Sequence, residues 1–235
     1  MPDINLAHLG VWYLVFVFST TCHEYAHALL AFKGGDTTAY EGGQLSLDPT
    51  PHVKRSPFGM VVVPLISYVY YGWMIGWASV PYDPQWGKRN PKRQGLMSLA
   101  GPAANLLLAA LALAAIRALL AAGVFQMLPP TQMSIQQLVV ATGDPTGQSP
   151  VSALAMALSI MVNLNVLLGV FNLIPVPPLD GAGVLEGLGP RSVAQLYEKL
   201  RAQPLLGLLG LVIAWKLFPY VAVPALSLVL SATLL

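Results

Sequence analysis

Five long stretches with almost no charged residues constrain this chain more than any other feature of its sequence. They cover residues 6–32, 57–82, 94–125, 150–179 and 204–235. An ionisable group is costly inside the hydrocarbon of a membrane, and a helix that crosses one needs about 20 mostly apolar residues. Over the whole chain, 55% of the residues are hydrophobic and only 9% are charged. This pattern predicts a multi-pass membrane protein and excludes an ordinary soluble domain.

The balance of charge and the cysteine count exclude further classes of protein. Twelve Lys and Arg against ten Asp and Glu leave a formal charge of +2, so we expect no nucleic-acid partner. A single cysteine, Cys22, excludes an internal disulfide framework and every Cys-rich zinc motif. A metal site in this chain would therefore be built from His, Asp and Glu.

Basic residues predict the orientation of the chain, because loops rich in Lys and Arg stay in the cytoplasm. They gather in residues 33–55, 88–93 and 191–201, whereas residues 126–149 contain none. The basic segments on either side of residues 57–82 would lie on opposite faces of the membrane if that stretch crossed it. We therefore expect 57–82 to be re-entrant, which agrees with the Pro and Gly residues that interrupt it. A kinked spanning helix is the alternative.

The resulting expectation is an all-α multi-pass membrane protein with one membrane-embedded domain, residues 1–235. About four transmembrane helices cover 6–32, 94–125, 150–179 and 204–235, and residues 126–149 form an outer loop. The first helix is not a cleaved signal peptide, because no basic residue precedes it and it contains a glutamate and two histidines. We expect the protein to lie in the cell membrane, with both termini on its outer side.

The first apolar stretch contains the motif H-E-x-x-H, formed by His23, Glu24 and His27. On a helix the two imidazoles lie one turn apart on the same face and can bind one zinc ion. Glu24 then lies beside the metal, where it can act as a general base. Two solvated histidines on a helix are the alternative, but a glutamate in a spanning helix is costly unless it has a use.

A catalytic zinc site usually has three protein ligands, and Asp180 is the candidate for the third. It follows a stretch with three prolines, and Gly181 after it permits an unusual turn, so we expect unwound backbone at residues 172–181 that orients the carboxylate. A polar cap on the next short helix is the alternative. With four spans, the first and fourth apolar stretches run in the same direction, so both ligand sets lie towards the cytoplasmic half.

The combination of H-E-x-x-H in one apolar stretch and N-x-x-P-x-P-x-L-D-G in another resembles the site-2 protease family of intramembrane zinc metalloproteases. The second motif runs from Asn172 to Gly181, and residues 101–105 resemble the G-P-x-x-N element of that family's central helix. The resemblance covers about residues 8–190 and implies the family's three-helix core. It indicates a short form without a PDZ domain or a nucleotide-binding regulatory domain.

The resemblance also implies roles for particular residues. His23, His27 and Asp180 would bind one zinc ion per chain, Glu24 would be the catalytic base, and Asn172 would hold substrate or the oxyanion. A helix-end hydrogen bond is the alternative for Asn172. For Asn105, which resembles a family position near the site, helix packing explains the stretch equally well. Residues 36–48 resemble the family's cytoplasmic-side β-hairpin, whose edge would pair with an unwound substrate.

The function expected from these features is that of an intramembrane zinc endopeptidase, with regulated intramembrane proteolysis as its role. It would cut a peptide bond within or next to a transmembrane helix of a membrane-protein or peptide substrate in the lipid bilayer. The alternative is a non-proteolytic zinc-binding membrane protein that senses or sequesters substrates. A transporter ranks last, because the third and fifth apolar stretches offer almost no polar lining. We expect His8 to lie too far from His23 to share a metal, and His52 to be a solvated loop residue.

Overall fold

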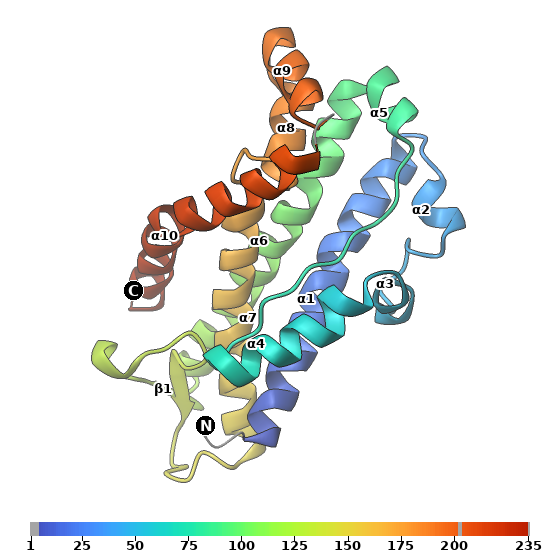
Figure 1. Cartoon of the computed structure of the whole chain (residues 1–235). Helices are drawn as coiled ribbons and strands as arrows, with labels where there is room; N and C mark the ends of the chain where they lie inside the picture. Colours follow the sequence, from blue (N-terminus) through green and yellow to red (C-terminus); the bar gives the residue numbers. More distant parts are fainter. Residues whose placement is uncertain (1–4, 202–203, 235) are drawn as a thin grey trace.

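The computed structural model describes residues 5–201 and 204–234 of the chain (Figure 1). Among them, four helices are long and apolar enough to cross a membrane. These spans are α1 (Leu6–Lys33), α6 (Pro91–Ala121), α7 (Pro150–Asn172) and Leu209–Thr233 within α10 (Pro204–Leu234). The predicted all-α class with about four spans is therefore confirmed. Residue 235, the predicted end of the last helix, lies outside the described residues.

The core of the molecule is formed by α1, α6 and α7. Helix α6 packs along both of the others, and α1 and α7 also contact each other. Helices α1 and α7 run in the same direction and α6 runs opposite to them (Figure 1). Helix α10 packs mainly on α7 and bends in its middle, as expected from the internal prolines Pro219 and Pro224.

The bounds of the core helices follow local rules. The side chain of Asn5 accepts hydrogen bonds from the first turn of α1, and Ser149 does the same for α7, which begins at Pro150. Helix α6 also begins at a proline, Pro91, three residues before the predicted start. Helix α7 ends at Asn172, where the predicted turn 172–181 begins, so the apolar stretch continues to 179 without the helix because prolines follow closely.

Residues 57–82 fold back on themselves. A π-helical turn η1 (Phe58–Val62) leads into α4 (Val63–Tyr71), which Gly72 ends in a left-handed conformation with φ 73°. The chain then returns in extended form along the core (Figure 1). On the way, the backbone N–H of Trp77 donates to the carbonyl of Gly59 at 3.1 Å. The segment is thus a short helix with an extended return, not one continuous helix, and its re-entry into the membrane stays a prediction.

The predicted β-hairpin at residues 36–48 is wrong. This segment forms the one-turn helix α2 (Thr38–Glu41) followed by bends, and α3 (Pro49–Arg55) comes next. Asp36 explains the difference, because one of its oxygens accepts from the backbone N–H of Thr38 at 3.0 Å and the other from that of Asp83 at 2.9 Å. A short polar side chain that satisfies nearby backbone favours a turn over a strand ladder.

The two-stranded antiparallel sheet of this protein lies instead in the predicted outer loop. Strand β1 (Phe125–Met127) pairs with β2 (Val139–Ala141), and a 3₁₀ turn η2 (Pro130–Gln132) lies between them. The sheet is at one end of the bundle. At the other end are α5 (Pro84–Arg89), α8 (Asp180–Leu188) and α9 (Arg191–Arg201) (Figure 1).

Candidate metal centre

The two histidines of the H-E-x-x-H motif lie on one face of α1, as the helical spacing predicts. Both are buried, each with 7% of its surface exposed. Their Nε2 atoms are 3.0 Å apart. The Nδ1 atom of His27 contacts the carbonyl of Met97 at 2.7 Å, and that of His23 contacts Oδ1 of Asn105 at 2.6 Å. Both partners belong to α6, so the neighbouring helix sets the orientation of both rings.

Asp180 reaches the histidines from the turn between α7 and α8. Its Oδ2 atom lies 3.2 Å from Nε2 of His23 and 3.3 Å from Nε2 of His27. Helix α7 ends at Asn172 and α8 begins at Asp180 itself, so the turn places the carboxylate at the start of a new helix. A Cβ atom at the next residue, Gly181, would collide with the backbone of Leu173, so the close packing of this turn requires glycine.

The three atoms fit a zinc ion. Zinc bonds to nitrogen and oxygen are about 2.0–2.2 Å long, which in a tetrahedron separates neighbouring ligand atoms by roughly 3.3–3.6 Å, a few tenths of an ångström more than the shortest separation seen here. The observed separations are 3.0, 3.2 and 3.3 Å. Oδ2 of Asp180 is buried and has no hydrogen-bond donor among the described residues. A carboxylate oxygen without a donor beside two imidazole nitrogens is the arrangement that a cation would satisfy.

Gly101 on α6 leaves the space that such an ion needs. A Cβ atom at this position would lie 2.6 Å from Nε2 of His23 and would also collide with Nε2 of His27. Any larger residue would therefore occupy the point at which the two histidines converge. The sequence suggested helix packing for this stretch, whereas the structure shows that Gly101 also opens the site.

Glu24 is buried on α1 next to His23, with 5% of its surface exposed. Adjacent residues of a helix point about 100° apart, so its carboxylate stands beside the ligand face rather than on it. It is not a member of the cluster of ligand atoms formed by His23, His27 and Asp180. This position agrees with the role of general base that the sequence predicts for Glu24, and that role stays a prediction.

Asn172 is less clearly connected with the site. Its side-chain N–H donates to the carbonyl of Leu168 at 3.0 Å, four residues earlier in α7. This is the helix-end hydrogen bond that the sequence offered as the alternative. A role for Asn172 with substrate stays a prediction.

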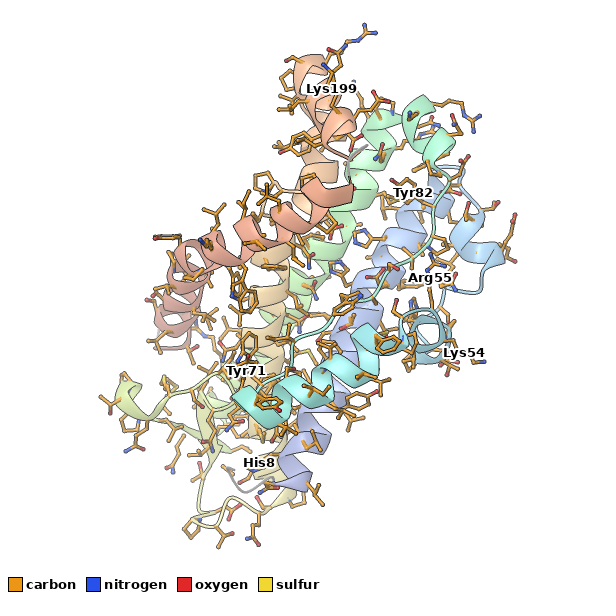
Figure 2. The ribbon with its side chains drawn as sticks, in the orientation of Figure 1. His8, Lys54, Arg55, Tyr71, Tyr82 and Lys199 are labelled. Atoms are coloured by element: carbon orange, nitrogen blue, oxygen red, sulfur yellow. The ribbon has the colours of Figure 1, made fainter. Side chains whose placement is uncertain are left out.

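Other residues differ from, or add to, what the sequence indicated. His52, expected to be solvated, is fully buried, and its Nε2 contacts the carbonyl of Ser46 at 2.9 Å. His8 lies near the end of the bundle opposite Lys199 (Figure 2). Asn165 on α7 did not stand out in the sequence, although it contacts Asn105. A polar residue in an apolar stretch was the available signal, and Asn165 was one of several.

The turn that carries Asp180 is also held from outside the spans. The hydroxyl of Tyr197 on α9 donates to the carbonyl of Pro175 at 2.6 Å. Glu198, also on α9, forms a salt bridge of 2.9 Å with Lys88 of α5. Their hydrogen bond raises the pKa of Lys88 and lowers that of Glu198. The side chains of Lys88 and Glu198 are exposed, so their salt bridge contributes little to stability. The hydrogen bond from the Tyr197 hydroxyl to Pro175 therefore contributes more to holding the turn.

Comparisons with known proteins agree with this geometry. The model of peptidase family M50 matches residues 11–215. A Bacillus subtilis protein named "Putative zinc metalloprotease YwhC" is 32% identical over 182 residues, which are 77% of this chain and 69% of the relative. Two proteins with the same description and the name Rip2 are 29% identical in Mycolicibacterium smegmatis and 30% identical in Mycobacterium tuberculosis. The matched parts are 77% of this chain and 59% of each of them. No solved structure matches significantly.

Apolar spanning helices around two histidines, a glutamate and an aspartate define the class of membrane zinc metalloproteases. This chain belongs to peptidase family M50. The predicted family, enzyme class and zinc cofactor are therefore confirmed. The chain spans 69% of the Bacillus relative and 59% of the mycobacterial ones, so substrate and partners remain matters for proposal.

Proposed function

We propose that this protein is an intramembrane endopeptidase that cuts a peptide bond within or next to a transmembrane helix of another membrane protein. The observation that supports it most is the depth of the ligand cluster. His23 and His27 lie inside one candidate span, and Asp180 follows directly after the turn that ends another. A site surrounded by spanning helices reaches substrate segments that are themselves in the membrane.

In this proposal His23, His27 and Asp180 hold the metal. Bound zinc would lower the pKa of a water molecule and polarise the carbonyl of the scissile bond. Glu24 accepts a proton at a carboxylate oxygen and returns it to the nitrogen of the leaving amine. The packing of α1, α6 and α7 keeps bulk water away from Glu24, which strengthens each electrostatic interaction at the site.

The surroundings of the site also support a membrane substrate. An apolar groove runs between α1 and α6, and its lining includes Tyr25 and Ala26, the two residues between Glu24 and His27. The groove presents almost no polar surface. A soluble, strongly polar peptide would lose its hydration there without replacement hydrogen bonds. We infer regulated intramembrane proteolysis as the biological role of such cleavage.

We further propose that the end of the bundle with α5, α8 and α9 faces the cytoplasm and that both termini lie outside. The residues that support this orientation are the basic ones at that end, within 88–93 and 191–201. The sheet at the opposite end lies in residues 126–149, which contain no Lys or Arg. In a Cys22→Ser background, a cysteine placed at Gln132 should react with an impermeant thiol reagent in intact cells. A cysteine placed at Lys92 should not, and the reverse pattern would contradict this orientation.

The experiment that tests the proposed activity compares cells that produce the wild-type protein with cells that produce Glu24→Gln. Mass spectrometry of protein N-termini in the membrane fraction detects cleavage of any membrane protein, so no candidate substrate has to be chosen. New termini that occur only with the wild type should fall within or next to apolar spans. Zinc content of the two purified proteins should be equal, because Glu24 is not one of the three ligands.

Three results would contradict the proposal. Identical termini from the two strains would exclude proteolysis by this site. If the new termini lie only in soluble regions, the protein is a protease, but its substrate segments are not in the membrane. Loss of zinc in Glu24→Gln would show that this glutamate is a ligand rather than the base.

A further inference from the structure

A continuous chain of buried amide hydrogen bonds leads from α7 to the metal-binding histidine His23. The side-chain nitrogen of Asn165 donates to the carbonyl of Met161 and to Oγ of Ser19, both at 2.8 Å. Nδ2 of Asn105 donates to Oδ1 of Asn165 at 2.7 Å, and Oδ1 of Asn105 contacts Nδ1 of His23 at 2.6 Å. Both asparagines have no exposed surface. The chain crosses all three core helices.

The direction of this chain is fixed at its far end. A backbone carbonyl only accepts hydrogen bonds, so the group of Asn165 that faces Met161 must be the amide nitrogen. Its oxygen then faces Asn105, and Asn105 must turn its own nitrogen towards it. The oxygen of Asn105 is thereby left facing His23, so that Nδ1 of His23 carries the proton. Its Nε2 atom is left with a lone pair directed at Asp180 and His27.

In both histidines Nδ1 carries the proton and Nε2 keeps its lone pair, but different groups impose this arrangement. Nδ1 of His27 faces the carbonyl of Met97 directly, and that group has only one role. His23 faces an amide side chain, which could present either its oxygen or its nitrogen. With the nitrogen of Asn105 in front of it, Nδ1 of His23 would have to accept, and Nε2 would carry the proton and lose its lone pair.

We propose that Asn165 is a positioning residue for the metal site, although it contacts neither metal nor substrate. It acts by locking the amide of Asn105 in the orientation that leaves Nε2 of His23 free to bind zinc. This inference depends on the proposed ligand set of His23, His27 and Asp180. It extends that set by a residue that acts two hydrogen bonds away from the metal.

The first test is the zinc affinity of Asn165→Leu, measured in detergent by competition with a chromogenic chelator. Loss of an outer partner of a metal-binding histidine commonly costs 10–100-fold in metal affinity, and we expect a loss in that range. Absorption of the cobalt-substituted protein should shift, because the orientation of one imidazole changes. Unaltered zinc affinity in folded Asn165→Leu would overturn the proposal.

Asn163→Leu is the matched control. Asn163 lies two residues away on α7, is 3% exposed, and donates its side-chain N–H to the carbonyl of Ile135 at 2.9 Å. Its substitution removes a buried amide of the same kind from the same helix, but on a face that leads to the outer loop. We expect its zinc affinity to stay within about threefold of the wild type, well short of the effect of an outer-partner loss. An equal loss in both variants would show that Asn165 acts only through stability, which would overturn the proposal.

Asn105→Asp provides a rescue that a merely structural role would not give. A carboxylate presents acceptor oxygens in both orientations, so its direction needs no lock and it can accept from Nδ1 of His23 either way. Asn105→Asp combined with Asn165→Leu should therefore recover most of the zinc affinity that Asn165→Leu loses. A double variant that binds zinc no better than Asn165→Leu would contradict the proposal.

Two further measurements keep the test decisive. If Asn165→Leu does not fold, Asn165→Ala takes its place, because it removes the same amide without adding bulk, and a zinc affinity equal to that of Asn163→Ala would overturn the mechanism. His27→Ala separates the ligand set from the role of Asn165. If His27→Ala keeps its zinc, the proposed ligand set is wrong. If His27→Ala loses zinc and Asn165→Leu does not, only the role of Asn165 is wrong.

Discussion

The two halves of the α6 and α7 pair differ in what holds the helices together, which is mainly apolar packing in one half and buried hydrogen bonds in the other. Towards the sheet, these helices bury a mainly apolar core that includes Ala112, Ile116 and Val162, and the buried polar residues Ser159 and Asn163 bond to the outer loop rather than to another core helix. Towards the α8 end, the same helices bury Asn105 and Asn165 against the histidines of α1. In a membrane, apolar packing holds helices together mainly through fit, because lipid is as apolar as the side chains. Buried polar groups must also be paired, so they determine orientation as well as distance.

Because of this difference, we expect substitutions in the two halves to affect different properties, stability in one and metal binding in the other. A change in the apolar half should lower the free energy of unfolding and leave zinc affinity alone. A change in the polar half should alter zinc affinity even where the fold survives. The following predictions test that separation.

The largest effect is expected from Gly101→Ala, which should abolish measurable zinc binding. The new Cβ atom would lie 2.6 Å from Nε2 of His23 and would collide with Nε2 of His27, against the atoms that are proposed to bind zinc. Gly10→Ala is the control, because a Cβ atom at Gly10 on α1 would meet nothing within 4 Å. Zinc content after gel filtration measures both. A folded Gly101→Ala variant with the zinc content of the wild type would show that the ion is not held where the three ligands converge.

Ile116→Ala should have the opposite signature. Ile116 is fully buried in the apolar half, so its truncation should cost about 2 kcal/mol of unfolding free energy, the lower end of the usual range. Zinc affinity should stay that of the wild type. Denaturation in detergent and zinc titration measure the two quantities. Weakened zinc binding in this variant would contradict the independence of the two halves.

A smaller effect is expected from Tyr197→Phe, which removes the hydrogen bond to Pro175 in the turn before Asp180. The loss should be about 1 kcal/mol in unfolding free energy, together with a fall in zinc affinity of no more than about fivefold. Tyr220→Phe is the control, because Tyr220 is 79% exposed on α10. The account of the turn fails if the two variants behave alike.

The smallest effect concerns Asp144 in the outer loop, far from the polar half. Hydrogen bonds from the hydroxyls of Ser152 and Thr146, with one more from the backbone N–H of Ser149, hold the pKa of Asp144 well below its usual range. A lowered pKa in the folded state stabilises the fold fully above the ordinary pKa of about 4, and this stabilisation is lost progressively as the pH falls from there through the lowered pKa. Asp144→Asn should therefore lower the melting temperature slightly at pH 7, by an amount that shrinks below pH ~4. A difference that is constant with pH would contradict this origin.

The sequence predicted much of this structure because membrane insertion and metal ligation leave strong local patterns. Charge gaps located the spans, and the basic segments implied that the first and fourth apolar stretches run in the same direction, as α1 and α7 do. The spacing within H-E-x-x-H and the proline-rich approach to Asp180 indicated ligands that the structure brings within 3.3 Å of one another.

What the sequence did not predict depends on contacts between distant segments. Residues 38–41 form a helical turn beside Asp36, whose carboxylate accepts not only from Thr38 but also from the backbone N–H of Asp83, 47 positions away. The proposed role of Asn165 depends on its hydrogen bond with Asn105, and the effect of Gly101 depends on the histidine rings of α1; a local sequence pattern contains neither contact. His52 is buried by the packing of α3 beside α1, although charged residues, Asp48, Lys54 and Arg55, lie close to it in the sequence.

The most direct test of the central claim is the zinc content per chain of Asp180→Ala beside the wild type. Asp180 is the proposed ligand that would join the end of α7 to the histidines of α1, and the idea of a single site formed by two spans depends on it. The account predicts about one zinc ion per wild-type chain. It predicts almost none in Asp180→Ala after dialysis, with helical content unchanged. Full zinc occupancy in folded Asp180→Ala would contradict it.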